Sequence, residues 1–507
     1  MATNQKVGGS NPFSRTNERN LSFDSIKRQV SLVLRNKLSC CEVQKMKEQS
    51  QARIISYNRN CNEICASAAR ISTTRGDADE IFELARGNAK NTDLTKRVLK
   101  SGHKSIIEHA VFTIAFCNVS VFVEQYLIEC RLASFTVKSR RYVDFSGVGY
   151  YVPPELEGEP LALYRDYMDT LFSAYGTLLE RGVPKEDARF LLPYSFRSNF
   201  YCTLNARELA HVIGSIRYGR GRGIPELNDL ADQLVPQIEA IFPALLSELE
   251  GPSSEDCAAA PAGVFRLQPS PRYVDGRNAA SARLIGAPPA PLDILRAAHR
   301  ISAPDSEQPF RVDSLLSSSR PRELEQLAYS FLISDITLAG LTHLVRHRMQ
   351  SVVIPPVQCT DHSRYIVPAS VKDCPEAWET YSAALERTHD MLQKIAGVPL
   401  LRKYGYYFVV SGNTMDVMTT ANGRELMLFL RLRTCSRAQW EIRGTAVSML
   451  RQLREHCPEL YDYFGPSCFL LGRCPEGKLT CGNMDEVCAA FDAGRRRDQE
   501  SNVESGR

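Results

Sequence analysis

Three consecutive basic residues, Arg346, His347 and Arg348, follow an apolar stretch in the segment "LVRHRMQS" at residues 344–351. Guanidinium groups form paired hydrogen bonds with phosphate and carboxylate oxygens, so this triplet could bind an anionic ligand. The plainer interpretation is a basic helix end, because cations interact favourably with the negative end of a helix dipole. Adjacent helical residues point about 100° apart, however, so three in a row do not serve one surface. At a junction between subunits they could instead reach different groups of one extended ligand.

Composition narrows the class of protein but not its activity. The chain has 507 residues, 43% of them hydrophobic, so it can bury substantial cores, and its length indicates more than one domain. The net charge is only +4, from 62 basic and 58 acidic residues, so we expect no nucleic-acid partner. We find no signal peptide or transmembrane stretch and expect no membrane association. The sixteen cysteines have irregular spacings, which favours reduced thiols in a cytoplasmic protein.

Changes in composition divide the chain into five segments. Residues 1–50 form a polar extension, residues 251–290 a linker rich in Pro and Ala, and residues 486–507 a charged tail. Two bodies remain, at residues 51–250 and 291–485.

The two bodies repeat each other. "ICASAARIS" (64–72) aligns with "ILRAAHRIS" (294–302), and "YLIECRLASF" (126–135) aligns with "HLVRHRMQSV" (343–352). Glu108 corresponds to Glu325 and Arg131 to Arg348, and both pairs have the same separation along the chain, which we call the repeat offset. A single register over nearly thirty residues indicates a tandem duplication that has diverged.

The elements that must position these residues follow the same order in both copies. Each copy opens with a helix that contains A-A-x-R-I-S, continues with a β-rich run, and then enters a helix that carries the triplet position. Long helices are predicted near residues 206–217, 226–249, 423–433 and 437–456. We therefore predict an α+β fold built as two tandem, diverged copies, each with a mixed sheet and long helices.

Five motifs together indicate a family. They are "GHKSIIEHAVFT" (102–113), "SRRYV" (139–143), "TLNAREL" (203–209), "RHRMQS" (346–351) and "LRLRTCSRAQWEIR" (430–443). The set resembles the flavin-dependent thymidylate synthases, whose marks are G-H-x-[ST]-x-x-E-H, R-H-R-x7-S and an N-x-R … A-Q-W-E-I helix region. One motif would be weak evidence, but five in family order across both bodies are strong evidence.

The resemblance implies a reaction and its cofactors. The family enzyme is a homotetramer whose sites lie between subunits and methylate C5 of a uracil nucleotide. NADPH reduces FAD, 5,10-methylenetetrahydrofolate gives up a one-carbon unit, and the flavin supplies reducing equivalents. The cofactors carry the difficult chemistry while the protein binds and orients them, so no cysteine nucleophile is assigned.

The two copies depart from the family motifs in different places. In the first copy the triplet positions read Glu129, Cys130 and Arg131, so the implied flavin clamp is damaged there. The second copy keeps the triplet but has Tyr406 where the first has Arg189, and a six-residue insertion displaces its S-x-R-Y segment. The defects of the two copies are complementary.

We therefore predict a working site that combines residues of both copies. The resemblance assigns cofactor binding to Ser72, Ser105, Glu108, Asn205, Arg207, Arg346, His347 and Arg348, and catalysis to His103, Arg189 and Arg364. Two chains are expected to form a homodimer that mimics the family tetramer, with half of its interlobe clefts competent. The reverse pairing, of Arg424 and Arg433 with Arg131 and Arg141, is interpreted as structural or vestigial.

Each assigned residue also has a structural interpretation. By resemblance His103 lies beside the flavin ring, but it could simply follow a helix end. Glu108 orients His103 or binds the flavin, or it pairs with a basic neighbour. Arg189 and Arg364 would offset the charge of a nucleotide dianion and polarise its ring, or they form surface salt bridges. Asn205 could cap the helix that follows it.

The substrate is less constrained than the reaction. Position eight after Arg348 is Pro356 instead of the family serine, and a duplicated, remodelled site indicates a changed substrate. We expect UMP to be converted to 5-methyl-UMP, with additional dUMP to dTMP activity, as in the members of this family that serve nucleoside-antibiotic biosynthesis. An ordinary dUMP-specific thymidylate synthase and a nucleotide-binding pseudoenzyme remain as alternatives.

Two further motifs have weaker interpretations. Cys468, Cys474, Cys481 and Cys488 lack the paired C-x2–4-C spacing of structural zinc, so no metal is predicted. "RYGRGRG" (217–223) could cradle a phosphate, although a solvated loop is the commoner outcome for such a segment.

Overall fold

The computed structural model describes residues 49–251, 264–304 and 309–492. The chain divides into two units, Met1–Gln49 and Ser50–Arg507, and the described residues lie almost wholly in the second. The predicted extension at residues 1–50 and most of the predicted tail fall outside the described residues.

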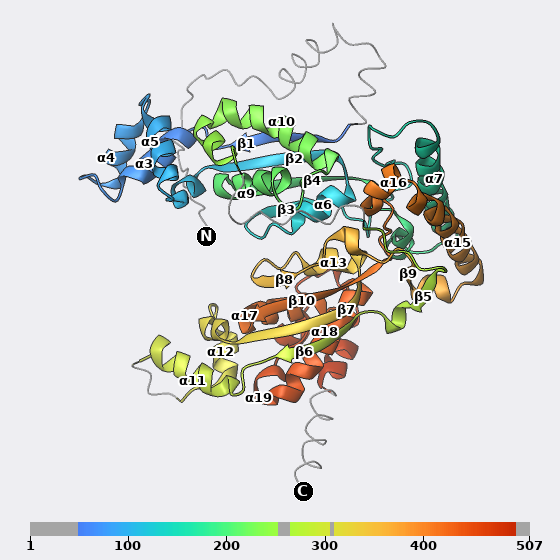
Figure 1. Ribbon diagram of the computed structural model, residues 1–507. Coiled ribbons are helices and arrows are strands. Elements are labelled where there is room, and N and C mark those ends of the chain that lie inside the picture. The colour runs from blue at the N-terminus through green and yellow to red at the C-terminus, as the bar shows by residue number, and fades with distance from the viewer. Residues whose placement is uncertain (1–48, 252–263, 305–308, 493–507) are drawn as a thin grey trace, which may run out of the picture. The chain divides into compact units, whose positions relative to one another are not determined.

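The first copy is a four-stranded sheet with helices (Figure 1). Its elements in chain order are β1 (Gln51–Tyr57), α3 (Cys61–Arg70), α4 (Ala78–Ala85), α5 (Asn91–Lys100), η1 (Lys104–His109), β2 (Val111–Ser120), α6 (Val121–Ile128), β3 (Ser134–Val137), α7 (Gly158–Glu180), α8 (Lys185–Ala188), η2 (Arg189–Leu191), β4 (Arg197–Asn205), α9 (Ala206–Arg217), α10 (Pro225–Ile241) and η3 (Pro243–Glu248). The strand order is β1-β2-β4-β3, with every neighbouring pair antiparallel.

The second copy repeats this arrangement. Its elements are β5 (Arg272–Asp275), η4 (Gly276–Asn278), β6 (Ser281–Gly286), α11 (Pro291–Ser302), α12 (Val312–Ser317), η5 (Arg322–Gln326), β7 (Ala328–Thr337), α13 (Leu338–Leu344), β8 (Gln350–Val353), η6 (Val357–Cys359), β9 (Arg364–Val367), α14 (Ala369–Lys372), α15 (Pro375–Gly397), α16 (Pro399–Lys403), η7 (Gly405–Tyr407), β10 (Thr414–Asn422), α17 (Gly423–Arg433), α18 (Trp440–His456), α19 (Pro458–Tyr461), α20 (Ser467–Leu471) and η8 (Gly477–Leu479). The order β6-β7-β10-β8 matches the first sheet strand for strand, and β5 pairs with β9 in parallel.

The sequence dictates the faces of these sheets. In β4, Phe200, Cys202 and Leu204 alternate with more exposed residues, as expected when one face of a strand packs on a core. A bulge interrupts each central pairing, and Asn118 and Asp335, which are separated by the repeat offset, have positive φ angles of 56° and 58° there. The duplication is therefore preserved even in local irregularities.

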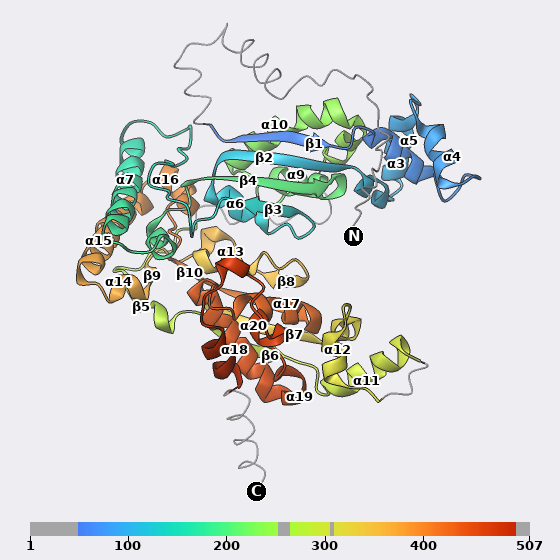
Figure 2. The same ribbon diagram turned by 180° about the vertical axis from the view of Figure 1, so that it is seen from behind.

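Two long helices that the sequence patterns did not single out join the copies. α7 and α15 each span 23 residues and start one repeat offset apart, and they pack against each other (Figure 2). Arg387 on α15 and Asp166 on α7 form an ion pair at 2.8 Å. The Tyr167 hydroxyl also donates to the Phe408 carbonyl at 2.6 Å.

A pair of reciprocal hydrogen bonds between the copies indicates that an approximate two-fold axis relates them. The Tyr194 amide donates to the Val409 carbonyl at 2.8 Å, and the Ser411 amide donates to the Leu192 carbonyl at 3.0 Å. The two donors are separated by the repeat offset, and so are the two acceptors. When two residues bond across the junction, their counterparts in the opposite copies form the equivalent bond.

The predicted α+β class and the tandem arrangement are confirmed. The predicted helices are present, although the one expected at 226–249 ends as α10 at Ile241 and continues as η3. Residues 272–286, inside the expected linker, form β5 and β6, so the structured part of the second copy starts earlier than predicted. Within the described ranges, every helix is too short or too polar to cross a bilayer.

Candidate functional site

A buried carboxylate fixes the helix that leads to the basic triplet. Thr337 caps α13 by accepting from the Gly340 amide at 2.9 Å, and Glu441 accepts from the Thr337 amide at 2.6 Å and from its hydroxyl at 2.5 Å. Gly340 is required here, because a Cβ at this position would lie 2.6 Å from Glu441 Oε2. Burial raises the pKa of Glu441 to about 7, although the Thr337 hydrogen bonds oppose this shift. The anchored helix ends at Leu344, one residue before Val345 and the triplet.

His347 is held inside its own copy. Arg433 Nε donates to His347 Nε2 at 3.0 Å, and because Arg433 has only donors, Nε2 must accept. The ring proton therefore lies on Nδ1, which faces Glu425 Oε1 at 3.0 Å. Burial lowers the pKa of His347, so the imidazole is neutral at neutral pH. His347 thus orients Arg433, a role that the sequence had not indicated.

Four arginines, two from each copy, converge on His343. Burial and then the charges of Arg189, Arg433, Arg346 and Arg141 lower the pKa of His343 well below its usual range. We call His343 and these four residues the arginine cluster. Arg141 and Arg189 come from the first copy and the other three residues come from the second, so neither copy forms the cluster by itself.

The arginine cluster has the properties of an anion site. Burial and neighbouring arginines lower the pKa of Arg189 and of Arg433 to about 10, so both remain protonated at neutral pH while repelling their neighbours. Arg189 is 2% exposed, and its Nη2 and His343 Nε2 are buried without a hydrogen-bond partner among the described residues. Buried donors normally find partners, so a polar, negatively charged ligand would satisfy both the charge and the unpaired atoms.

Two of the predicted arginines lie elsewhere. Arg348 donates to Ser134 Oγ of the first copy at 3.2 Å, and its counterpart Arg131 reaches Ser351 Oγ at 3.5 Å, so both tie the copies together. Arg364, displaced by the insertion, donates to Asp335 at 2.6 Å in a separate cavity of about 650 Å³. Neither side chain is among the charges that act on His343.

The residues predicted to bind flavin through the first copy form a third group. Ser72, His103, Ser105 and Glu108 are exposed, and Glu108 pairs with Arg207 at 2.6 Å. Asn205 accepts from the Glu208 amide at 2.9 Å, so it is the N-cap of α9. Within the described part of the chain, no hydrogen bond or ion pair joins this group to the arginine cluster.

The equivalent positions on the opposite side of the approximate two-fold have lost the positive charges of the four arginines. By the repeat offset, the arginine cluster corresponds to Tyr126, Glu129, Ile216, Gln358 and Tyr406, which we call the neutral counterpart. No arginine of the cluster is kept there.

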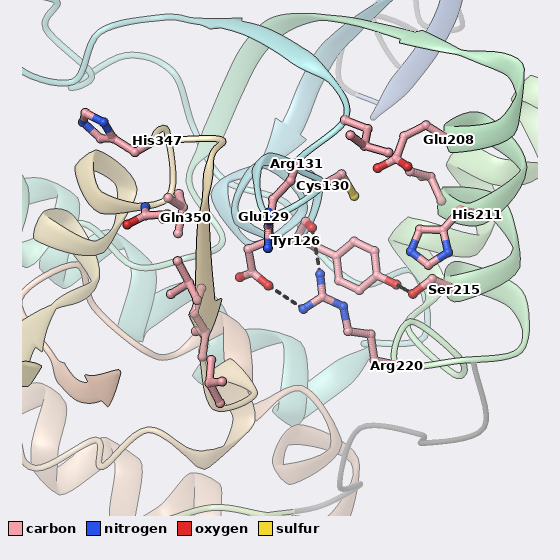
Figure 3. A pocket seen from close by; sticks show the side chains of 16 residues that line it. Tyr126, Glu129, Cys130, Arg131, Glu208, His211, Ser215, Arg220, His347 and Gln350 are labelled. Atoms are coloured by element: carbon pink, nitrogen blue, oxygen red, sulfur yellow. Dashed lines mark hydrogen bonds and ion pairs between the residues drawn. The ribbon is translucent and has the colours of Figure 1, made fainter. Parts of the chain in front are cut away.

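A different arginine neutralises Glu129. Arg220 donates to the Glu129 carboxylate and to the Tyr126 carbonyl, and it lies over the Tyr126 ring at 4.3 Å (Figure 3). It comes from the "RYGRGRG" segment, which is neither a phosphate cradle nor a free loop at this residue. These residues line a cavity of about 510 Å³ that also contacts His347 and Gln350 of the second copy.

Sequence reasoning missed the residues whose role depends on the junction. His343 has no basic motif of its own, and Arg141 and Arg433 were interpreted as structural or vestigial because the reverse pairing lacks most of the basic triplet. The repeat offset was the available signal, since it predicts which positions become equivalent. The thirteen cysteines in the described part are free thiols, and no group of three or more metal-ligating side chains occurs there.

Comparisons with known proteins agree with the repeated architecture. The family model described as thymidylate synthase complementing protein matches residues 53–244 and 283–459. The chain is 32% identical over 184 residues to the flavin-dependent thymidylate synthase of Geobacter sulfurreducens, covering 36% of this chain and 79% of that protein. It is 31% identical over 196 residues to the Clostridium tetani protein of the same name, covering 35% of this chain and 78% of that protein. It is also similar to the crystal structure of the UMP/dUMP methylase PolB from Streptomyces cacaoi bound with 5-Br dUMP, with 25% identity, a TM-score of 0.35, and coverage of 40% and 95% of the two chains.

Proposed function

Because the chain belongs to the thymidylate synthase complementing protein family of flavin-dependent thymidylate synthases, we propose that it methylates C5 of a uracil nucleotide at the arginine cluster. The observation that carries this proposal is a group of arginines from both copies, in which Arg141 and Arg433 line one cavity and Arg189 keeps a buried nitrogen without a partner among the described residues. A nucleoside monophosphate carries close to two negative charges at neutral pH and would offset their mutual repulsion. The same cations would stabilise negative charge as it develops on the uracil ring.

The exposed group of the first copy is suited to hold FAD. The side chains of Ser72, His103 and Ser105 make no hydrogen bond within the described residues, so they are available to a ligand. Glu108 and Arg207 offer a carboxylate and a guanidinium beside them, with Asn205 at the start of α9. When bound there, FAD would supply the reducing equivalents, with NADPH as their source and 5,10-methylenetetrahydrofolate as the one-carbon donor.

A second copy of the chain would bring these two groups together. Among the described residues no hydrogen bond or ion pair joins the arginine cluster to the exposed group, yet the proposed reaction requires flavin and nucleotide to meet. We infer a homodimer in which each flavin group completes the arginine cluster of the other chain. Mixing inactive Arg346→Ala and His103→Ala chains would restore activity if sites form between chains. If each site forms within one chain, the mixture stays inactive.

UMP is the substrate we propose, with dUMP as a second one, in nucleoside-antibiotic biosynthesis. The duplication, the insertion before Arg364 and Pro356 at the family serine position support a remodelled substrate site. The test is parallel incubation with UMP and dUMP, each with NADPH and methylenetetrahydrofolate. Formation of 5-methyl-UMP supports the proposal, formation of dTMP alone identifies a dUMP-specific enzyme, and a flavin-free protein with neither product refutes it.

A further inference from the structure

The cavity beside the arginine cluster is closed by a segment that lies beyond the part of the chain matched by the family model. Arg141 and Arg433 line a cavity of about 240 Å³, together with Arg431 and Arg437. Its other wall consists of residues between Ser467 and Val487, whereas the family match ends at residue 459. We call residues 467–487 the C-terminal cover.

The C-terminal cover is anchored at both ends. At its start, Ser467 Oγ donates to the Arg431 carbonyl at 3.5 Å, where α20 packs on α17. Just beyond its end, the Phe491 ring packs against Phe469 at 5.8 Å, and buried Arg454 donates to the Phe491 carbonyl at 3.2 Å. The ends are therefore fixed while the intervening stretch crosses the cavity.

The stretch between the anchors is built to turn over the arginines. Gly472 ends α20 with φ of +62°, and Gly482 has φ of +80°. These positive φ angles are strained for residues that have a Cβ, so glycine is favoured at both turns. Between them lie Glu476, Leu479 and Thr480, which line the cavity opposite Arg433. The cavity is slightly smaller than the range of about 300–1,000 Å³ typical of ligand pockets, so it would enclose part of a nucleotide.

We propose that the C-terminal cover is the outer wall of the nucleotide site and closes against a bound uracil nucleotide, thereby limiting which nucleotides the arginine cluster accepts. The proposal rests on the proposed function for the identity of the ligand. It assigns a role to the cysteine-rich end of the chain, for which no metal ligand set is present among the described residues.

The chain carries its own reporters for this wall. Cys474 and Cys481 are partly exposed thiols that line the cavity from the cover, and Cys435 lines it from the arginine side. Cys117 and Cys374 are also partly exposed but do not line this cavity. A nucleotide seated between the arginines and the cover would shield the first set of thiols and leave the second set unchanged.

The test is the alkylation rate of each cysteine in the full-length protein, followed by mass spectrometry with and without UMP or dUMP. At a nucleotide concentration about ten times its Kd, alkylation of Cys474 and Cys481 should slow by about tenfold, because only the free fraction reacts. The rates at Cys117 and Cys374 should not change. Equal slowing at all four thiols, or no slowing at Cys474 and Cys481, would overturn the proposal.

The outcomes separate this inference from the proposed function. Methylation of UMP without protection of Cys474 and Cys481 supports the proposed function and refutes the proposed role of the C-terminal cover. Protection of the two thiols without methylation supports the C-terminal cover as the wall of the nucleotide site and refutes the proposed function.

As a second readout, Thr480→Trp should fill the cavity and raise KM for UMP by about tenfold. Asn483→Trp, on the same cover but outside the cavity, should not change KM for UMP. Equal KM values for the two variants would contradict the proposed role of the C-terminal cover.

Discussion

The arginine cluster and its neutral counterpart occupy equivalent places on the two sides of one approximate two-fold, yet they differ in residue type at every position. His343, Arg346 and Arg433 on one side correspond to Tyr126, Glu129 and Ile216 on the other. The backbone that supports them is the same, because both α13 and α6 begin at a hydroxyl cap and end beside the triplet position. The fold alone therefore does not make a site, and the charged side chains decide which side binds an anion.

The two sides also differ in how their charges are balanced. Glu129 is compensated internally by Arg220, whereas Arg189 keeps a buried nitrogen without a partner among the described residues. A guanidinium paired inside the fold is committed to structure, whereas a buried nitrogen without a partner is available to a ligand. Four substitutions test this difference.

The largest effect on activity is expected when Arg346 of the arginine cluster is replaced by glutamate, the residue at the equivalent position 129. Arg346→Glu places a negative charge where the nucleotide dianion would lie, so kcat/KM for UMP should fall by about a thousandfold. The matched change Glu129→Gln, in the neutral counterpart, should leave kcat/KM within about twofold. Comparable losses in steady-state assays of both variants would show that the two sides are functionally equivalent.

The second largest effect concerns the buried cation. Arg189→Met removes a charge-assisted contact to the ligand, so the Kd for UMP measured by calorimetry should rise by about a hundredfold. Among the described residues the guanidinium donates from Nε to the Glu186 carbonyl at 2.9 Å, so the ligand-free variant should lose only about 1 kcal/mol of stability. A variant that binds UMP normally would remove Arg189 from the site.

The third effect is on stability and lies in the neutral counterpart. Arg220→Met leaves Glu129, whose side chain is 13% exposed, without its ion-pair partner, so the free energy of unfolding should drop by about 1–2 kcal/mol. Denaturant unfolding measures the drop, and methylation by the folded variant should persist. Loss of activity in a variant of normal stability would contradict the assignment of Arg220 to structure.

The smallest effect is a difference in pH dependence. His343 stays neutral when folded because burial and the arginines lower its pKa, whereas in the unfolded chain it takes up a proton below about pH 6.5. The unfolded state then binds more protons, so stability is lost as pH falls, by about 1.4 kcal/mol at pH 5.5.

Denaturant titrations at pH 7 and pH 5.5 measure this slope. His343→Gln should flatten it, while Tyr126→Phe at the equivalent position should not. Glu441 has a raised pKa of about 7, so its effect on stability has the opposite sign and favours the folded state as pH falls. This effect is the same in all three proteins and cancels in the comparison. Identical slopes in the wild type and in His343→Gln would show that His343 titrates normally in the folded protein.

Much of the fold could be predicted from the sequence, because the repeats carry it. The repeat offset predicted tandem copies, and the β-rich run predicted in each copy contains β2 and β7. The strands β5 and β6 were missed because their residues lie in a Pro- and Ala-rich segment that resembles a linker. β6 is stabilised by its pairing with β7, a tertiary contact that composition does not reveal.

The site was less accessible to sequence reasoning for a geometric reason. Arg189 and Arg346 were expected in one site although they come from different copies, and the charges of both lower the pKa of His343. Arg364 was expected with them although a six-residue insertion displaces its S-x-R-Y segment. The structure pairs Arg364 with Asp335, and the charge of Arg141 acts on His343 instead. A motif specifies residue types, whereas the identity of the residues that meet at a junction depends on the packing of both copies.

The reciprocal bonds between Tyr194 and Val409 and between Ser411 and Leu192 connect two halves of one polypeptide. In an oligomer of identical subunits, one codon change alters every symmetry-related position at once. Covalent fusion removes that constraint, because each half is encoded separately and can accumulate its own substitutions. One side of the molecule was thereby free to become scaffold, as Glu129 and Arg220 did, without any corresponding loss on the other.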